Sequence, residues 1–399
     1  MNSKVSICIP SFNHARFLPA AIESALAQTY RDIEIIIVDD GSSDGSLEIA
    51  QEYATNYPEL IYLYTHPNHS NRGISATINR AFRESKGEYW TLLGSDDIYH
   101  PEKAAQQVSF LLQSSRYGWV YSGAEIIDEQ GQILPTKNCT DISHDLRPLE
   151  SLILANHITA ITVMARRECL EVTGEHSEQL VYSDWEFWIR MGAHYKFGYV
   201  SSPLVKYRIH SYNTSRGVER NVQMQRHLDV LNSIRANAAR YGGQLLIPRI
   251  QALVELRRAH FLFYLAQEEA AAESLNSVFE LWPSILSELS SLYRWLTVTY
   301  ESPGLYKWMS EHLPEELPSS FKKRTIRLLM GLMYARAAME CYQSGDLRGA
   351  RDLAVRAQMT DQRWLSDRAL LSLLCETMVG STAMKIARRL GRRTLINRR

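Results

Sequence analysis

Residues 88–97 read EYWTLLGSDD, an apolar stretch that ends in two adjacent aspartates. Aromatic and apolar residues in a short run favour a buried strand, which we expect over 88–93. A buried carboxylate without a partner is costly, so packing alone explains Asp96 and Asp97 poorly. Carboxylate oxygens are the ligands that a hard divalent cation prefers. The stretch therefore predicts a strand that brings a metal-binding pair to the edge of a sheet.

A second pair of aspartates, Asp39 and Asp40, closes the run EIIIV at 34–38. An aspartate at a strand end can accept a hydrogen bond from a nucleotide base or a ribose hydroxyl, and ligands of open α/β sheets bind beyond the carboxyl ends of strands. The two pairs together indicate a site for a metal and a nucleotide. A simpler role for the following segment, with Asp44 capping the next helix, is compatible with this interpretation.

Residues 1–125 alternate short β-branched runs with helical patterns, which predicts βαβ units around a mostly parallel sheet. The expected strands are 4–9, 34–38, 61–65, 88–93 and 117–122, and the expected helices are 18–28, 45–55, 73–85 and 101–114. The pattern is mixed from 125 to about 215. There we expect extended runs at 124–134, 159–165, 196–200 and 204–210, and a helix at 183–192.

The character of the chain changes beyond about residue 220, where strand signals vanish and helical spacing dominates. We expect a first domain at 1–220, an all-helical domain at 226–380 and a basic tail at 384–399. Small residues between Ala338 and Ala357 resemble one tetratricopeptide unit. The helical domain is thus either a short array of helical hairpins or an ordinary bundle.

The charge is balanced, since Lys and Arg together number 44, as do Asp and Glu. The whole chain therefore gives no electrostatic case for nucleic acid as a partner. The segment 384–399 carries seven basic residues and no acid. A basic segment of this kind can lie on an anionic membrane, although a solvated tail is the simpler interpretation.

Five scattered cysteines without a CxxC pair favour reduced thiols and a cytoplasmic protein. The N-terminus leads straight into a strand pattern, so we expect no signal peptide. The sequence also has no uncharged apolar stretch of 18 residues, so we expect no membrane-spanning helix.

Two further motifs lie near the expected sheet edge. Pro10, Ser11 and Asn13 follow the first strand, where an ordinary turn is the alternative to a ligand-binding loop. In the stretch 71–79, Arg72 could pair with a phosphate and Asn79 could brace the neighbouring loops. A capped surface helix is the alternative for that stretch.

Two motifs in the second half of the mixed region carry titratable groups. On the helix at 183–192, Trp185 and Trp188 share a face, and Asp184 lies beside it. A carboxylate against aromatic rings is suited to act as a general base near a sugar. The alternative is a surface helix whose acids pair with Arg190. His210 ends an apparent strand, and a lone histidine becomes a candidate metal ligand only beside a carboxylate site.

These motifs, in this order, resemble those of the inverting family-2 glycosyltransferases with the GT-A fold over residues 3–215. The resemblance implies an α/β domain with a Rossmann-like mixed sheet, with Asp40 as the partner of a uracil ring. It implies Mn²⁺ or Mg²⁺ on Asp97 and His210, and Asp184 as the base. The residues expected to hold the nucleotide-sugar are Pro10, Ser11, Asn13, Asp39, Asp40, Arg72, Gly73, Asn79 and Asp96.

One departure from the family pattern is Ser183, which stands where the family has a glutamate before the base. The resemblance otherwise implies a one-step displacement, in which the metal stabilises the diphosphate leaving group and Asp184 takes the proton of an acceptor hydroxyl. Configuration at the anomeric carbon then inverts.

We accordingly expect a glycosyltransferase that uses a UDP-sugar and a glycan or lipid-linked acceptor in surface polysaccharide synthesis. We expect it in the cytoplasm, with peripheral membrane contact through the tail and a protein partner for the helical domain. The rival suggested by Ser183 is an inactive nucleotide-sugar-binding scaffold. A nucleotidyltransferase is disfavoured, because 10–14 is not a Gly- and Lys-rich triphosphate loop.

Overall fold

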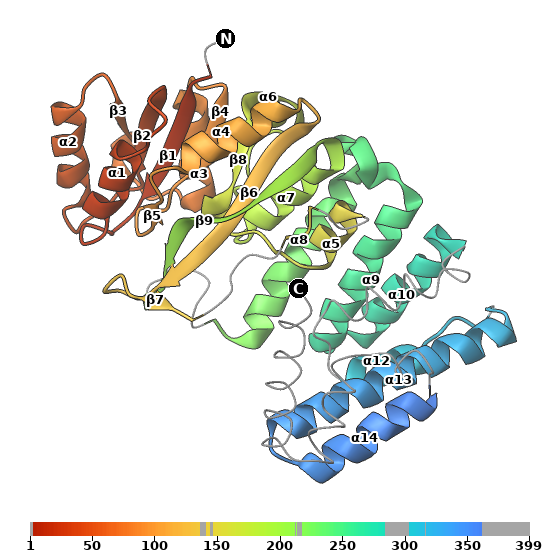
Figure 1. The fold of residues 1–399 in the computed structure, drawn as a ribbon. Coiled ribbons are helices and arrows are strands. Elements are labelled where there is room, and N and C mark those ends of the chain that lie inside the picture. Colours follow the sequence, from red (N-terminus) through yellow and green to blue (C-terminus); the bar gives the residue numbers. More distant parts are fainter. Residues whose placement is uncertain are drawn as a thin grey trace, which may run out of the picture. The chain divides into compact units, whose positions relative to one another are not determined.

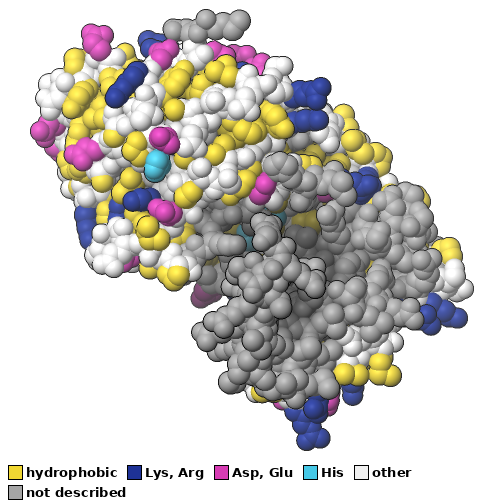
Figure 2. Space-filling view, viewed as in Figure 1, with side chains coloured by type: hydrophobic (Ala, Val, Ile, Leu, Met, Phe, Trp, Pro, Cys, Tyr) yellow, Lys and Arg dark blue, Asp and Glu magenta, His cyan; other side chains and the backbone are white. Residues whose placement is uncertain are grey.

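The structure, a computed structural model, describes residues 3–135, 141–143, 147–211, 213, 218–283, 303–315 and 317–360. The chain divides into two compact units, Met1–Leu265 and Ala266–Arg399 (Figure 1). On the face drawn in Figure 2, basic and acidic side chains are interspersed, as the balanced composition leads one to expect.

A nine-stranded sheet in the order β3-β2-β1-β4-β8-β6-β9-β5, with β7 paired to β6, forms the centre of the first unit. The strands are β1 (Val5–Ser11), β2 (Ile33–Asp39), β3 (Ile61–Thr65), β4 (Tyr89–Leu92), β5 (Ile98–Tyr99), β6 (Tyr117–Ile127), β7 (Ile133–Leu134), β8 (Met164–Arg166) and β9 (Lys196–Arg208). β1 runs parallel to both β2 and β4, whereas β8 is antiparallel to β4 and β6. The sheet is therefore mixed, and the carboxyl ends of β1, β2 and β4 meet at one edge.

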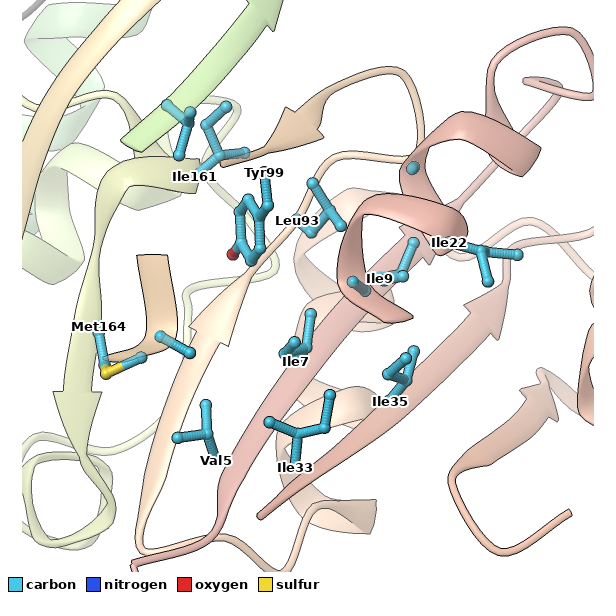
Figure 3. Close-up of a cluster of buried hydrophobic side chains, with 14 of the residues drawn as sticks. Val5, Ile7, Ile9, Ile22, Ile33, Ile35, Leu93, Tyr99, Ile161 and Met164 are labelled. Carbon is cyan, nitrogen blue, oxygen red and sulfur yellow. The ribbon is translucent and has the colours of Figure 1, made fainter. Parts of the chain in front are cut away.

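Helices cover both faces of the sheet. They are α1 (Leu18–Leu26), α2 (Ser46–Asn56), α3 (Ile74–Glu84), α4 (Lys103–Gln113), α5 (Pro148–Leu154), α6 (Arg167–Thr173), α7 (Ser183–His194), α8 (Arg220–Tyr241) and α9 (Pro248–Tyr264), with short 3₁₀ turns at Pro67–His69, Ala160–Thr162 and Gly243–Leu246. Figure 3 shows Ile7 and Ile9 of β1 and Ile35 of β2 lying with Ile22 of α1 in one buried cluster.

The other face of the sheet packs aromatic rings. The ring of Trp90 on β4 lies 4.4 Å from that of Phe82 on α3 and 6.5 Å from that of Trp188 on α7, between ring centroids. Alternate side chains of a strand point to opposite faces, so β1 and β4 contribute to both layers. The α/β mixed-sheet fold expected from the sequence is confirmed.

The second half of the sheet differs from the expectation in detail. The runs expected at 196–200 and 204–210 form the single strand β9, which lies along β6 (Figure 1). A proline inside a run usually marks a strand end, but Pro203 pairs with Gly123 where the register shifts. The helices α5 and α6 and the short strand β5 were not expected.

The second unit is helical in the part that the structure describes. Its helices are α10 (Glu268–Leu281), α12 (Pro303–Glu311), α13 (Ser319–Gln343) and α14 (Leu347–Thr360). The turn between α13 and α14 holds Gly345 at a φ of 88°, and Ala338 and Ala350 are fully buried. This is the segment in which the sequence resembles a tetratricopeptide unit, and that resemblance stays a prediction.

The division between the units lies at 265/266 rather than between 220 and 226, because α8 and α9 pack with the sheet domain. Arg249 Nε of α9 lies 2.9 Å from Glu150 Oε1 of α5. His194 Nε2 of α7 lies 2.6 Å from the carbonyl oxygen of Tyr241 in α8. The predicted basic tail at 384–399 lies outside the described residues. Among the helices that are described, none has the length and apolar character needed to cross a membrane.

Candidate active site

The loops that follow β1 and β2 are fastened to each other. Asn13 has a φ of 51°, a left-handed conformation that asparagine tolerates better than most residues. Its side-chain Oδ1 accepts a hydrogen bond from Ser43 N at 2.8 Å, and its backbone N donates to Ser42 Oγ at 3.0 Å. Asp40 N also donates to the carbonyl of Ser11 at 2.8 Å. The side chain of Asn13 is thus used to hold two loops together.

The two aspartates at the end of β2 have different surroundings. Asp40 accepts from Arg72 N at 2.6 Å and from Gly73 N at 3.0 Å, one bond to each carboxylate oxygen. Asp39 Oδ1 accepts from the backbone of Gly41 and Ser42, whereas Asp39 Oδ2 is buried without a hydrogen-bond partner among the described residues.

This arrangement differs from the expectation that Asp40 is the partner of the nucleotide base. Both oxygens of Asp40 hold the loop that begins α3, so it positions Arg72 and Gly73. The polar atoms left without a partner at this edge, within the described part of the chain, are Asp39 Oδ2 and Ser11 Oγ. A buried unpartnered polar group is unfavourable, so these two atoms are the better candidates to meet a ligand.

Asn79 holds the segment before α7 through both polar atoms of its side chain. Its Oδ1 accepts from His176 N at 2.8 Å, and its Nδ2 donates to the carbonyl of His176 at 2.9 Å and to Glu178 Oε1 at 3.1 Å. These contacts fit the bracing role expected for Asn79, since this buried side chain joins two elements, while a contact with the donor stays a prediction. Arg72, in contrast, has an exposed side chain.

Ser183 and Asp184 begin α7 and are joined to the same edge. Ser183 Oγ lies 2.8 Å from Ser75 Oγ at the start of α3, the helix whose first loop Asp40 holds. Asp184 accepts from Asn156 Nδ2 at 3.3 Å and from Trp185 N at 2.7 Å. Burial raises the pKa of the Asp184 carboxyl, and a carboxylate with a raised pKa is a stronger base.

The other acid of this helix is not a surface group. Glu186 is fully buried and pairs with Arg190 Nη2 at 2.9 Å, so the alternative of a surface ion pair is wrong. Arg190 also donates to the carbonyl of Glu175 at 2.7 Å. The Glu186–Arg190 ion pair lies within α7. Of the two acids in the first turn of this helix, Asp184 is therefore the candidate for a catalytic role.

A cluster of metal-ligand side chains lies beyond β4. Ligand-type atoms of His14, Asp96 and His210 lie within 4.8 Å of one another, and His210 Nε2 is 2.8 Å from Asp96 Oδ2. Burial lowers the pKa of His14, so its imidazole is neutral near pH 7. Two imidazoles and a carboxylate form a donor set that fits a divalent first-row cation.

The surroundings of the adjacent aspartates differ from those expected, because Asp96 rather than Asp97 lies beside His210. Asp97 is buried, its Oδ1 accepts from Arg208 N at 2.8 Å, and burial followed by the charge of Asp96 raises its pKa well above the usual range. A Cβ on Gly94 would lie 2.4 Å from Asp97 Oδ2, so a larger residue there would displace the Asp97 carboxylate.

His14 was not among the residues expected at the site. It follows Asn13 directly, and no spacing in the sequence connects it with Asp96 or His210. The His14 ring is held near the loop after β4 by Ser95, whose Oγ lies 2.8 Å from His14 Nδ1. The one sequence feature that could have indicated His14 as a site residue is its place directly after the loop motif at the end of the first strand.

Comparisons with known proteins agree with this geometry. Residues 6–172 match the family model described as Glycosyl transferase family 2. Over these residues the chain is similar to a family 2 glycosyltransferase domain. An uncharacterized glycosyltransferase of Rickettsia prowazekii is 34% identical over 221 residues, which cover 53% of this chain and 65% of that protein. The chondroitin synthase of Escherichia coli is 27% identical over 229 residues, 57% of this chain and 32% of the synthase.

Solved structures share the fold of the family 2 domain. S. aureus TarS 1–349 in complex with UDP-GlcNAc is similar with a TM-score of 0.51 at 14% identity, covering 89% of this chain and 91% of that one. The same fragment without that ligand gives a TM-score of 0.50. The loops described above thus lie at the carboxyl edge of a glycosyltransferase-type sheet.

Proposed function

We propose that this chain is an inverting glycosyltransferase that moves a sugar from a UDP-sugar to an acceptor hydroxyl. The observation that carries the proposal is the convergence of the β1, β2 and β4 loops, which lie within the family 2 match at 6–172, with the first turn of α7, which follows it. Asp40, after β2, accepts a hydrogen bond from Gly73 before α3, and Ser75 in α3 contacts Ser183 at the start of α7. Asp184, the next residue, is thus connected to the loop after β2 through α3.

The donor would lie across the ends of β1 and β2. Asp39 Oδ2 would accept from the N–H of the base and Ser11 Oγ would bond a polar group of the nucleoside, while Pro10, Asn13 and Gly73 shape the loops around it. The exposed guanidinium of Arg72 would pair with the diphosphate. A UDP-sugar is supported by the complex named for TarS, which shares the fold.

A divalent cation, Mn²⁺ or Mg²⁺, fits the residues at the end of β4. Asp96 and His210 would hold it, and Asp97 would keep their loop in place through Arg208. Such an ion supplies Lewis-acid stabilisation of the diphosphate leaving group.

Asp184 would act as the general base. Its carboxylate accepts the proton of the acceptor hydroxyl, whose oxygen bonds to the anomeric carbon as the bond to the diphosphate oxygen breaks. Attack from the face opposite the leaving group inverts the configuration. The acceptor would be a glycan or lipid-linked sugar of a surface polysaccharide, a class that the chondroitin synthase relative supports.

A screen of UDP-, GDP- and dTDP-sugars with and without Mn²⁺ tests the proposal. A ligand that binds the folded protein alone raises its melting temperature in a concentration-dependent way. We expect a UDP-sugar to do so with Mn²⁺ and to release UDP steadily. Binding without release across the panel and with sugar acceptors would favour the scaffold role, and no binding at all would contradict both.

A further inference from the structure

We propose that His14 is a third protein ligand of the cation site, beside Asp96 and His210, and that this set selects Mn²⁺ over Mg²⁺. The inference rests on the proposed donor site, and it adds a ligand from the loop after β1. That loop is also the one that borders the proposed nucleotide.

The distances fit a single ion. Ligand atoms about 2.1 Å from one cation lie roughly 3 Å apart when adjacent and about 4.2 Å apart when opposite. The 2.8 Å between His210 Nε2 and Asp96 Oδ2 matches adjacent ligands. The limit of 4.8 Å for the whole set exceeds the span of opposite ligands by about 0.6 Å and that of adjacent ligands by about 1.8 Å, so a bound ion would draw the His14 ring inward by an amount within this range.

The His14 ring is held in orientation by the protein. Its Nδ1 lies 2.8 Å from Ser95 Oγ, which would leave Nε2 as the ring nitrogen available to the cation. The backbone N of His14 donates to Ser46 Oγ at 3.0 Å, and the carbonyl accepts from Phe17 N at 2.9 Å. Metal-binding histidines characteristically use the second nitrogen in such a fixing hydrogen bond.

The two imidazoles are already in contact. The rings of His14 and His210 lie edge to face at 5.4 Å between centroids, and Phe17 stacks on His210 at 5.3 Å. Later first-row cations bind imidazole most tightly, and Mn²⁺ accepts an imidazole nitrogen more readily than Mg²⁺, which prefers oxygen ligands and keeps its waters. A second imidazole therefore raises the affinity for Mn²⁺ with little gain for Mg²⁺.

Direct metal binding tests this ligand without reference to turnover. The full chain would be titrated with Mn²⁺ and with Mg²⁺, alone and with UDP, by calorimetry. Nitrogen couplings of bound Mn²⁺ would be counted by pulsed electron paramagnetic resonance. His14→Gln can keep a bond to Ser95 but has no imidazole, His210→Gln is the positive control, and His100→Gln on the exposed surface is the matched control.

We expect two imidazole nitrogens on Mn²⁺ in the unmodified protein and one in His14→Gln. The Mn²⁺ affinity of that variant should fall about tenfold or more, with less than a twofold change for Mg²⁺. Its melting temperature without metal should match that of the unmodified protein, which separates ligation from folding. One imidazole in the unmodified protein, or unchanged Mn²⁺ affinity in His14→Gln, would overturn the inference.

The outcomes also separate this inference from the proposed function. Two imidazoles on Mn²⁺ in a protein that binds no nucleotide-sugar would support His14 as a ligand and contradict the proposed transferase function. Turnover of a UDP-sugar with a single bound imidazole would leave the transferase standing without His14 as a ligand.

Discussion

Asp96 and Asp97 are neighbours in the chain, yet the turn after β4 gives them opposite surroundings. Asp96 contacts the imidazole of His210, whereas Asp97 is buried and accepts a hydrogen bond from the backbone N–H of Arg208. The sequence predicts that the pair is functional, because two carboxylates after a buried strand lack a packing role. It does not predict which one faces the site, because that depends on where β9 passes, and β9 is distant in the chain.

The base assignment makes a prediction at the same scale. Asp184→Asn removes the proton acceptor but keeps the size of the side chain, so we expect transfer to fall about 10²- to 10⁴-fold while donor binding survives. UDP release and a UDP titration would measure the two quantities, with the exposed Glu171→Gln as control. Equal turnover in Asp184→Asn would remove Asp184 from the mechanism.

Ser183 yields a prediction about stability. The side chain is only 4% exposed and contacts Ser75 and His176, whose low pKa keeps its ring neutral. Ser183→Glu, which restores the family acid, would therefore bury a carboxylate without a positively charged partner. We expect the free energy of unfolding to fall by several kcal/mol, and Ser183→Ala to cost about 1 kcal/mol. Urea unfolding measures both. A Ser183→Glu protein as stable as the unmodified one would mean that this position opens to solvent.

At the scale of elements, α3 and α7 are joined through Asn79. Asn79→Ala would leave the N–H and the carbonyl of His176 without partners, at about 1–3 kcal/mol for each buried group. We therefore expect a loss of roughly 2–6 kcal/mol of unfolding free energy. Asn56→Ala, at the exposed end of α2, should change it little. Equal effects of the two substitutions would contradict the bracing role.

His176 predicts a pH dependence at the same junction. Burial lowers the pKa of His176 to about 3, against an ordinary value of 6.5. Between these values the unfolded chain binds a proton that the folded chain does not, so stability is lost as the pH falls below about 6.5, by about 1.4 kcal/mol per pH unit.

His176→Phe keeps a ring against Phe187, which lies 4.2 Å away between centroids, and removes the titration. Urea unfolding of the unmodified protein, His176→Phe and His100→Phe at pH 7 and pH 5 measures this. The free energy of unfolding should fall less between these pH values in His176→Phe than in the other two proteins, which should behave alike. Parallel losses in all three would show that His176 is protonated in the folded state.

The elements themselves were predictable where their signals are local. β1 to β4 and α1 to α4 follow apolar periodicity, Pro19 lies at the first turn of α1, and turn residues lie between. β9 was expected as two runs because Pro203 interrupts the pattern and proline usually marks a strand end. The strand continues past Pro203 because its pairing with β6 shifts register around Gly123, a tertiary feature without a local signal. The short helices α5 and α6 offered too few residues for a periodic pattern.

At the scale of the molecule, the change from mixed to helical sequence does not coincide with the division into compact units. The sequence pattern assigns most of α8 and all of α9 to the helical domain. In the structure, α9 forms an ion pair with α5, and α8 accepts a hydrogen bond from α7 of the sheet domain. Composition reports the type of element, whereas a unit is defined by what its elements pack against. The boundary at 265 therefore could not be read from the sequence.

The basic tail carries a prediction for the whole chain. Each basic residue near an anionic surface adds about 1 kcal/mol, so deletion of 384–399 should weaken binding to anionic vesicles by orders of magnitude and leave neutral vesicles unaffected. Vesicle sedimentation of both proteins measures this. Unchanged binding to anionic vesicles would leave the tail without a membrane role.

The most direct test of the central claim, that one edge of the sheet binds and breaks a nucleotide-sugar, is a pre-steady-state measurement of UDP formation with Mn²⁺ and a saturating UDP-sugar. Repeated turnovers should be seen in the unmodified protein, and UDP formation should be about 10²- to 10⁴-fold slower in Asp184→Asn, with the donor still bound by both. A donor that binds tightly to the unmodified protein and stays intact in the presence of sugar acceptors would contradict the claim.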